Sequence, residues 1–400
     1  MTAPARIRIG FVTSLDPLDR RSWSGVYYSI YRALERNVGE VVALGPVNMR
    51  WPFALGDRLN SWLVKPLTGK RYQYGWSIAV ARWYAWVFGR RLARQPVDLL
   101  VAPASFTEIA YLRTSVPIVY IEDSTLHQLI GFYPGLSNLT DTSIAELNHL
   151  EARALAQASL VCYSSEWAAQ SAQADYHAPA TKLAVVPFGA NYPAPPTREQ
   201  ALRHTLAADG RCHLFLLGGE WGRKGGDIAY ATLLALQQRG IEAVLTVVGC
   251  RPASLENYTN PGLRIIPFLN MGKEDDRRQL HELFSTADFF ILPSRAECAA
   301  IAFCDANSFG LPVLTTDVGG ISSFIEQGVN GYMLSRSATG EDFAERIAQL
   351  LADPAHYQRL RQQSREQYEV RLNWDVWAQR LHQELVARQL LRPSATPAPH

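Results

Sequence analysis

The sequence predicts an α/β protein with two Rossmann-like, doubly wound domains that face a cleft. Three observations predict this class. The chain has 400 residues, which is too long for one ordinary hydrophobic core. Short runs that are apolar on both faces alternate with helical stretches, as in a parallel sheet covered by helices. One proline-rich segment interrupts the alternation, and two such domains usually bind a ligand in the cleft between them.

The first domain is predicted to span residues 1–190. An apolar run at 6–12 leads into a polar loop and then into a helix over 25–36, and a second clear helix covers 145–158. Further short apolar runs separate the helical stretches and are expected to be strands; they lie at 41–44, 99–102, 118–121, 160–163 and 183–186. This alternation favours a parallel sheet.

The second domain is predicted to span residues 191–373. Four prolines fall within 187–197, and because proline lacks a backbone N–H, this segment is expected to be a linker. Beyond it, strands are expected at 213–217, 243–248, 263–266, 289–292 and 312–315, and helices at 227–239, 276–285, 301–309 and 342–352. A last helix over 374–391 is expected to pack back on the first domain, and the tail 392–400 is expected to be disordered.

Composition and charge exclude several classes of protein. The formal net charge is +2, from 39 basic and 37 acidic residues, which argues against a nucleic-acid binder. No stretch of about 20 uncharged apolar residues is present, so no helix is expected to span a bilayer. The start of the sequence lacks a signal-peptide core, and the five cysteines form no CxxC pair and no zinc-spaced cluster. We therefore expect a soluble, cytoplasmic protein without a metal site.

One segment has an unusual charge distribution. Residues 58–97 contain eight basic side chains, no acidic ones and four tryptophans. Two interpretations stay open. The aromatic side chains can pack a helix onto the first domain while the arginine heads stay solvated. Alternatively, the segment can make peripheral contact with the inner face of a membrane or with an anionic acceptor.

A glycine-rich turn with adjacent cations follows the first predicted strand of the second domain. Residues 216–227 have the sequence LLGGEWGRKGGD, in which Arg223 and Lys224 precede Gly225 and Gly226. Such a turn leaves backbone N–H groups free and puts positive charge beside them. This combination suits a diphosphate.

Two further strand ends carry chemically useful residues. Glu297 closes the loop after the strand at 289–292, and Asp305 lies eight positions on, a little over two helical turns, so that both acids can face one cleft. The small residues between them let a ligand approach the helix N-terminus closely. The segment 315–321, TTDVGGI, is another strand followed by a glycine-rich turn. All three segments lie at the carboxyl ends of strands, where open α/β sheets bind ligands.

Together these segments resemble the retaining glycosyltransferases of the large family 4, also called glycosyl transferases group 1, which have the GT-B architecture. The likeness rests on the E-x7-E region, here Glu297 to Asp305, on NSFGLPVLTTDVGGISSFIEQGVNGYML at 307–334, and on the RKGG turn at 223–226. The Trp23-Ser24-Gly25-Val26 turn after the first strand is also similar to that family. The resemblance is diffuse over the first domain and strong from 216 to 334, where three motifs occur in the correct order and spacing.

The resemblance implies roles for particular residues. Arg223 and Lys224 look like the cationic pair that neutralises the donor diphosphate as the glycosidic bond breaks, which is the task of a metal in other sugar transferases. Glu297 looks like the carboxylate that holds donor-sugar hydroxyls, and Asp305 corresponds to the acid that binds the nucleotide ribose. The other positions that the resemblance assigns to donor binding are Gly25, Gly249, Ala299, Ala300 and Ile301.

The sequence departs from the family's pattern at two places. The second acid is usually Glu, and Asp305 is one methylene shorter, which implies a looser or shifted ribose contact. Many relatives carry a His after the strand equivalent to 118–121, where this sequence has Glu122, Asp123 and His127. Asp123 is the first candidate to meet the donor sugar, and Glu122 and His127 are the alternatives.

The predicted function is therefore a retaining, metal-independent hexosyltransferase that uses a UDP- or GDP-linked sugar and a hydroxyl acceptor, in polysaccharide or glycolipid synthesis. Its predicted catalytic set is Arg223, Lys224, Glu297 and Asp123. No cofactor is expected, because the nucleotide-diphospho-sugar is a co-substrate, and retention rests on the resemblance alone. A nucleotide-sugar epimerase, a phosphorylase or a non-catalytic sugar-nucleotide-binding protein on the same fold are the alternatives. No motif identifies the acceptor, which can be a sugar, a polysaccharide or a lipid-linked hydroxyl.

Overall fold

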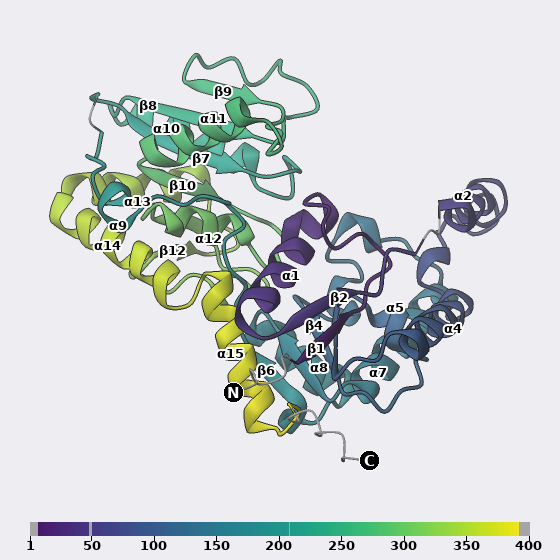
Figure 1. The fold of residues 1–400 in the computed structure, drawn as a ribbon. Coiled ribbons are helices and arrows are strands. Elements are labelled where there is room, and N and C mark those ends of the chain that lie inside the picture. Colours follow the sequence, from purple (N-terminus) through teal and green to yellow (C-terminus); the bar gives the residue numbers. More distant parts are fainter. Residues whose placement is uncertain (1–6, 48–49, 208, 392–400) are drawn as a thin grey trace, which may run out of the picture. The chain divides into compact units, whose positions relative to one another are not determined.

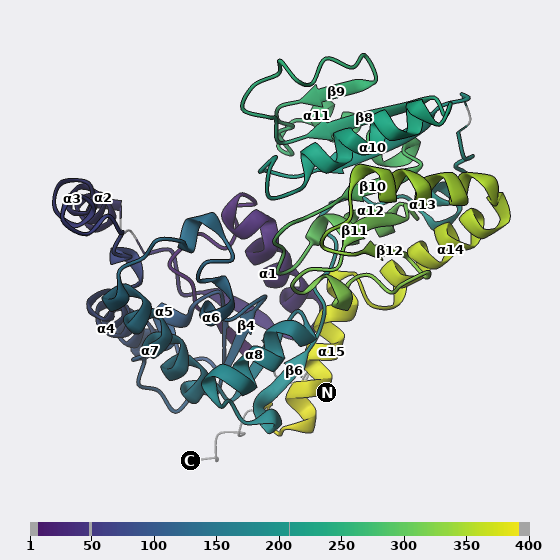
Figure 2. The same ribbon diagram turned by 180° about the vertical axis from the view of Figure 1, so that it is seen from behind.

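The chain folds into two compact units, each built on one six-stranded parallel sheet (Figures 1 and 2). The computed structural model describes residues 7–47, 50–207 and 209–391, so the predicted tail 392–400 lies outside the described residues. Unit 1 combines the chain up to Val186 with the chain from Trp377 onward, and unit 2 spans Pro187–Val376. The predicted class of two Rossmann-like α/β domains is confirmed.

The sheet of unit 1 has the strand order β2-β1-β3-β4-β5-β6. Its strands are β1 (Arg8–Phe11), β2 (Glu40–Ala43), β3 (Leu99–Pro103), β4 (Ile118–Glu122), β5 (Leu160–Tyr163) and β6 (Leu183–Val185). All pair in parallel, with Ile9 opposite Leu99 and Val119 opposite Leu160. The central strands β3 and β5 are buried along their whole length. Their sequences are apolar on both faces because both faces of a parallel sheet are covered.

Helices connect the strands of this sheet. They are α1 (Val26–Asn37), α2 (Arg50–Leu59), α3 (Lys65–Thr68), α4 (Ile78–Arg94), α5 (Phe106–Ile109), α6 (Leu126–Leu129), α7 (Asp141–Gln157) and α8 (Glu166–Tyr176). In α7 the buried residues Leu147, Leu150 and Ala154 follow the spacing of a single helix face. Thr140 begins that helix by accepting a hydrogen bond from the backbone N–H of Ser143.

The sheet of unit 2 has the order β12-β11-β10-β7-β8-β9. Its strands are β7 (Cys212–Leu217), β8 (Ala243–Val248), β9 (Leu263–Ile266), β10 (Phe289–Leu292), β11 (Val313–Thr316) and β12 (Gly331–Leu334). The helices are α9 (Arg198–Ala201), α10 (Gly226–Gln238), α11 (Glu274–Thr286), α12 (Ile301–Ser308), α13 (Gly340–Ala352), α14 (Pro354–Val370) and the start of α15 (Trp374–Ala387). The strand order steps outward from β7 in both directions, as in other doubly wound sheets.

The pattern of apolar runs predicts every strand of both sheets except β12, and it does not predict helix α14. β12 begins at Gly331 and is an edge strand that pairs only with β11. In α14 the polar side chains of Arg361 and Arg365 are buried, because their guanidinium groups donate to backbone carbonyls. Arg361 donates to Ala201 at 2.6 Å, and Arg365 donates to Pro196 at 2.8 Å. Such burial gives no apolar periodicity in the sequence.

The proline-rich segment 187–197 contains no helix or strand, as predicted for a linker. It runs beside the residues at the start of α15. Ala190 donates to the carbonyl of Leu372 at 3.0 Å, and the rings of Phe188 and Trp374 stack with centroids 5.4 Å apart. A Cβ atom at Gly189 would lie 2.3 Å from the backbone nitrogen of Trp374, so only glycine permits this approach. The two chain segments at the boundary of unit 2 are thus held together.

Within the described part of the chain, no helix is long and apolar enough to cross a membrane. The five cysteines are all buried and form no disulfide, and Sγ of Cys304 donates to the carbonyl of Phe188 at 3.4 Å.

Candidate active site

The turn after β7 carries the two predicted cations, and its glycines set their positions. A Cβ atom at Gly218 would lie 2.8 Å from Cγ of Lys224, so glycine lets the lysine stem lie against the end of the strand. The backbone N–H of Lys224 donates to the carbonyl of Glu220 at 2.9 Å. Gly249, which follows β8 with φ +91°, would place a Cβ atom 2.8 Å from the carbonyl oxygen of Gly218. The ends of β7 and β8 are therefore in close contact.

This turn is bound to the loop after β10 by backbone and side-chain contacts. Gly225 has φ +71°, and a Cβ atom there would lie 2.0 Å from the carbonyl oxygen of Pro293. Arg295 donates from its backbone to the carbonyl of Arg223 at 2.8 Å and from its guanidinium to the carbonyl of Gly222 at 2.6 Å. The same guanidinium forms a bidentate pair with Asp227, with distances of 2.8 and 2.7 Å. Such a planar pair fixes orientation as well as distance.

Glu297 lies where these two segments meet. Its carboxylate pairs with the ammonium of Lys224, and Nη1 of Arg223 is 3.8 Å from the same oxygen. Arg223 also donates to the carbonyl of Ala296 at 3.0 Å and to Glu220 at 3.2 Å. The side chains of Arg223, Lys224 and Glu297 are only 15%, 12% and 6% exposed, so three charges are held largely out of water. Buried charges are tolerated when they are paired in this way.

The third predicted segment also meets Glu297. After β11, the backbone N–H of Gly320 donates to the carbonyl of Glu297 at 3.1 Å. The hydroxyl of Thr316 donates to the carbonyl of Ser294, and the hydroxyl of Ser294 lies 3.5 Å from the Glu297 carboxylate. The three sequence segments therefore converge on one residue, at the carboxyl ends of β7, β10 and β11.

Asp305 has a different environment from Glu297. It lies on α12, is buried, and accepts a hydrogen bond from the backbone N–H of Tyr192 at 2.7 Å and another from Asn191. Burial raises its pKa to about 7, because desolvation disfavours the charged carboxylate more than these hydrogen bonds favour it. The predicted donor-binding positions Ala299, Ala300 and Ile301 form the start of α12, where the N–H of Ile301 donates to the carbonyl of Ala299.

Gly25 and Asp123 belong to unit 1. Gly25 has φ +85° and precedes α1, and the two residues before it, Trp23 and Ser24, also have positive φ angles of 45° and 53°. Left-handed conformations in non-glycine residues each cost about 1–3 kcal/mol and cluster at functional sites. This strained turn before α1 coincides with the Trp-Ser-Gly-Val segment of the sequence.

The three residues predicted as candidates for contact with the donor sugar differ in their surroundings. Glu122 accepts from the hydroxyl of Tyr120 at 3.1 Å, and burial together with Asp123 and Glu151 raises its pKa well above the usual range. Asp123 is half-buried and accepts from the hydroxyl of Ser124 at 3.0 Å. His127 is exposed and lies 3.6 Å from Asp175 of α8. The choice between these residues stays a prediction.

The structure adds residues that the sequence did not identify as part of the site. Arg295 and Asp227 lie inside the quoted segments, but a contact across 68 residues leaves no local signal in the sequence. Glu220 orients Arg223 from the same turn.

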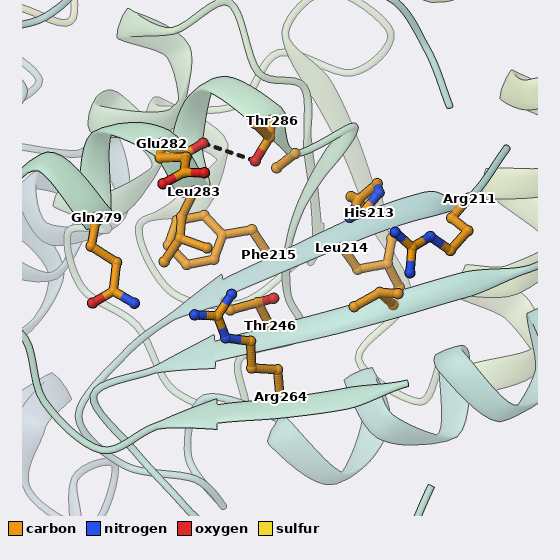
Figure 3. Close-up of a pocket in the computed structure, with 12 residues that line it drawn as sticks. Arg211, His213, Leu214, Phe215, Thr246, Arg264, Gln279, Glu282, Leu283 and Thr286 are labelled. Atoms are coloured by element: carbon orange, nitrogen blue, oxygen red, sulfur yellow. Dashed lines mark hydrogen bonds between the residues drawn. The ribbon is translucent and has the colours of Figure 1, made fainter. Parts of the chain in front are cut away.

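A separate cavity of about 360 Å³ lies in unit 2, between α11 and the strands β7, β8 and β9 (Figure 3). Glu282 and Thr286 line its helix side, and Arg264 and Thr246 line its strand side. These side chains come from the sheet face beneath α11, and none of the predicted site residues is among them. No group of three or more His, Cys, Asp or Glu suited to a metal ion occurs among residues 7–47, 50–207 and 209–391. Metal independence stays a prediction.

Comparison with known proteins finds a family match in the second half of the chain. Residues 223–367 match the family described as glycosyl transferases group 1. The matched region contains Arg223, Lys224, Glu297 and Asp305, which carry the resemblance that the sequence predicts. The predicted GT-B fold is confirmed by solved structures of the same fold. The family match also supports the prediction of a glycosyltransferase enzyme.

Individual relatives agree with the family match. It is 23% identical over 211 residues to a D-inositol 3-phosphate glycosyltransferase of Nocardiopsis dassonvillei, an alignment that covers 50% of this chain and 49% of the relative. The chain thus spans about half the length of this curated relative. The sucrose-phosphate synthase of Thermosynechococcus elongatus has the same fold, with TM-score 0.65, 16% identity and coverage of 96% and 99% of the two chains. The Anabaena protein HepE, solved with UDP and glucose, gives TM-score 0.61, 16% identity and coverage of 95% and 100%.

The close approach at Gly225 gives a first prediction. Replacing Gly225 with Ala forces a left-handed alanine against the carbonyl of Pro293, and we expect a loss of at least about 2 kcal/mol in the stability of unit 2. The matched control is Gly222→Ala, because a Cβ atom at Gly222 has no heavy-atom neighbour within 4 Å. Thermal unfolding by calorimetry measures both variants. Equal melting temperatures for the two would contradict this packing.

The buried carboxyl of Asp305 gives a second prediction. Its pKa is about 7 in the folded chain and 3.8 in an unstructured peptide, so the folded state binds more protons between these values. The contribution of Asp305 to stability therefore falls as the pH rises from about 4 to about 7. The free energy of unfolding of Asp305→Asn, measured relative to wild type, should therefore rise by about 1–3 kcal/mol from pH 5 to pH 8.

Calorimetric scans at pH 5 and pH 8 test this dependence. Asp317→Asn is the matched control, because Asp317 is exposed on the turn after β11. A pH dependence that is the same in wild type and in Asp305→Asn would show that this carboxyl does not titrate in that range.

Proposed function

We propose that this protein is a retaining, metal-independent glycosyltransferase that moves a hexose from a nucleotide-diphospho-sugar to a hydroxyl acceptor. The observation that carries the proposal is the cluster of Arg223, Lys224 and Glu297 at converging strand ends, inside the region that matches the group 1 family. Strand ends of this kind bind ligands in open α/β sheets.

The donor diphosphate is assigned to the turn after β7. Arg223 and Lys224 supply two positive charges there, in surroundings with little access to water, where charge stabilisation is stronger than in bulk solvent. The solved complex of HepE with UDP and glucose supports a nucleotide-sugar donor, and UDP is preferred over GDP as its nucleotide. Gly249 and the start of α12 at Ala299, Ala300 and Ile301 complete the proposed donor-binding set in unit 2.

The proposed reaction needs no cofactor. The bond between the anomeric carbon and the diphosphate oxygen breaks, and its electron pair goes to the leaving diphosphate, whose charge Arg223 and Lys224 offset. A new bond forms between the anomeric carbon and the acceptor oxygen on the same face of the sugar. The acceptor proton passes to the leaving diphosphate, so no side chain has to act as a base. Exclusion of water favours transfer over hydrolysis.

Other residues have proposed roles in orienting the donor. Glu297 would hold hydroxyls of the donor sugar, and Asp305 would bind the ribose. Within unit 1, Asp123 is the proposed partner of the donor sugar and Gly25 a donor-binding glycine; both assignments rest on the resemblance to the family. The pairing of Lys224 with Glu297 means that an incoming diphosphate competes with this carboxylate for the lysine.

A free hydroxyl group is the one requirement that the proposed reaction places on the acceptor. A sugar, a polysaccharide or a lipid-linked hydroxyl satisfies it. The basic segment 58–97 supports peripheral contact of a cytoplasmic protein with the inner face of a membrane.

Thermal shift measurements with a panel of nucleotide-diphospho-sugars test donor binding. A donor present at 100 times its dissociation constant should stabilise the folded state by about 2.7 kcal/mol. We expect one donor to raise the melting temperature selectively, and EDTA to leave this rise unchanged. Absence of a shift with every donor would favour a non-catalytic protein, and a shift lost with EDTA would contradict the metal-free site.

Substitution of Lys224 tests the role of the cationic turn. Lys224→Met should lower the rate of transfer by at least about 100-fold, since loss of one preorganised charge contact costs roughly 3 kcal/mol in the transition state. The matched control is Lys273→Met, which removes an exposed lysine of the same unit. Transfer is followed as release of the nucleoside diphosphate. A Lys224→Met variant that keeps its folded melting curve and full activity would refute the assignment.

A further inference from the structure

A helical arm in unit 1 lies against Tyr72 and Tyr74. Helix α2 continues through a π-helical turn, Asn60–Val64, into α3. A Cβ atom at Gly56 would lie 2.7 Å from Cβ of Tyr74, so α2 lies directly against this tyrosine. The side chain of Asn60 donates to the carbonyl of Tyr72 at 2.7 Å and accepts from its N–H at 2.8 Å. The inner face of the arm is thereby fixed.

The arm also has an exposed apolar face. Its large side chains are Leu55, Leu59, Trp62, Leu63 and Leu67. Trp62 is 83% exposed and Leu67 is 75% exposed, the two highest values among the exposed large hydrophobic side chains of the described residues. The four leucines are spaced by four residues, which would drift around a regular α-helix. The single π turn, in which Lys65 donates to the carbonyl of Asn60, offsets part of this drift between Leu59 and Leu63.

Basic side chains border this apolar face. Arg58 and Lys65 lie on the arm and are accessible to solvent, as is Asp57 beside them, and 58–97 as a whole has eight basic and no acidic residues. All 37 acidic residues of the chain therefore lie outside this segment. The positive charge is local, although the whole protein is nearly neutral. A nearly neutral protein with one basic, apolar arm is suited to a specific anionic surface.

We propose that the face formed by Leu55, Leu59, Trp62, Leu63 and Leu67 docks on an anionic lipid surface. This inference rests on the proposed function and deepens it, because it names the surface through which the enzyme contacts a membrane. A helix with an apolar face, flanking cations and an interfacial tryptophan lies in the plane of the lipid headgroups and buries that face in the acyl boundary. The structure fits this arrangement because the arm presents these side chains outward.

The dimensions of the arm favour a lipid surface over a second copy of the chain. Residues 50–68 form a helix roughly 28 Å long and 10 Å wide, which gives a face of about 300 Å². A stable protein interface needs roughly 800 Å² from each partner. A lipid surface needs no such area, since each buried leucine or tryptophan adds to the binding separately.

The neighbouring helix α4 adds a second contact of the same character. Figures 1 and 2 show α2 and α4 at the same end of unit 1. Trp86 of α4 is exposed, and the guanidinium of Arg90 lies 4.7 Å from its ring centre. Arg91, in contrast, donates to the carbonyls of Leu44 and Pro46, so its charge serves the folded unit. The surface for lipid binding therefore centres on the arm and on the exposed side of α4.

Flotation of the full-length protein with lipid vesicles tests the proposal. The vesicles contain either phosphatidylcholine alone or phosphatidylcholine with phosphatidylglycerol. The wild type should bind the anionic vesicles more strongly, and added salt should weaken this binding. The variant Trp62→Gln with Leu63→Gln and Leu67→Gln should bind at least about tenfold less, and glutamine preserves the helix propensity of the arm. Arg58→Gln with Lys65→Gln should lose about fivefold per charge on anionic vesicles.

The control is Phe268→Gln, which removes a 73% exposed aromatic side chain of unit 2 and should leave vesicle binding unchanged. The donor-induced thermal shift, measured on the same samples, should be the same in all variants. If the triple variant binds the anionic vesicles as strongly as the wild type does, the proposal is overturned. The proposal is also overturned if the wild type does not bind anionic vesicles but forms dimers, and the triple variant forms none. A donor shift without vesicle binding overturns only the docking surface, and vesicle binding without a donor shift overturns only the transferase.

Discussion

The pairing of Glu297 with Lys224 and Arg223 is the interaction on which the candidate site depends. Three charged groups that are largely withdrawn from water must be paired, because an isolated charge in such surroundings is strongly destabilising. The carbonyl of Glu297 also accepts from the backbone N–H of Gly320, so the turns after β7, β10 and β11 are all fixed through this residue. An anionic ligand at these strand ends therefore meets a site whose positive charge is already oriented. When such a ligand binds, its contact with Lys224 replaces the contact between Lys224 and the carboxylate of Glu297.

Close backbone approach makes this convergence possible. Gly225 against Pro293, and Gly249 against Gly218, are contacts that any side chain would prevent. The bidentate pair of Arg295 and Asp227 then holds the two loops at a fixed orientation. Rigid loops of this kind suit preorganised electrostatic stabilisation, which loses its value if the groups must reorient during the reaction. In unit 1, by contrast, the positive φ angles of Trp23 and Ser24 store strain in the turn before α1.

Most of the fold and much of the site follow from the sequence. The central strands are apolar on both faces, so runs such as 99–102 and 289–292 identify them. The convergence of three glycine-rich or acidic segments follows from their place after parallel strands, whose carboxyl ends share one edge of the sheet. The sequence does not reveal that Asp305 is buried against the backbone of Tyr192, or that Glu297 is ion-paired, because these contacts join residues that are 113 and 73 positions apart.

The sequence by itself therefore determined the two-domain α/β class and the residue types of the candidate site, since periodicity and local turns encode them. Only the tertiary structure decided which polar groups are buried and which apolar groups are exposed. Arg361 and Arg365 are buried because carbonyls of distant segments accept their hydrogen bonds. Since buried arginines leave no apolar periodicity in the sequence, that periodicity does not predict helix α14. Leu63 and Leu67 have a core-like spacing but are exposed, because the arm packs on Tyr72 and Tyr74 through Gly56 and Asn60 instead. Burial is a property of contacts between distant segments, and no local pattern contains it.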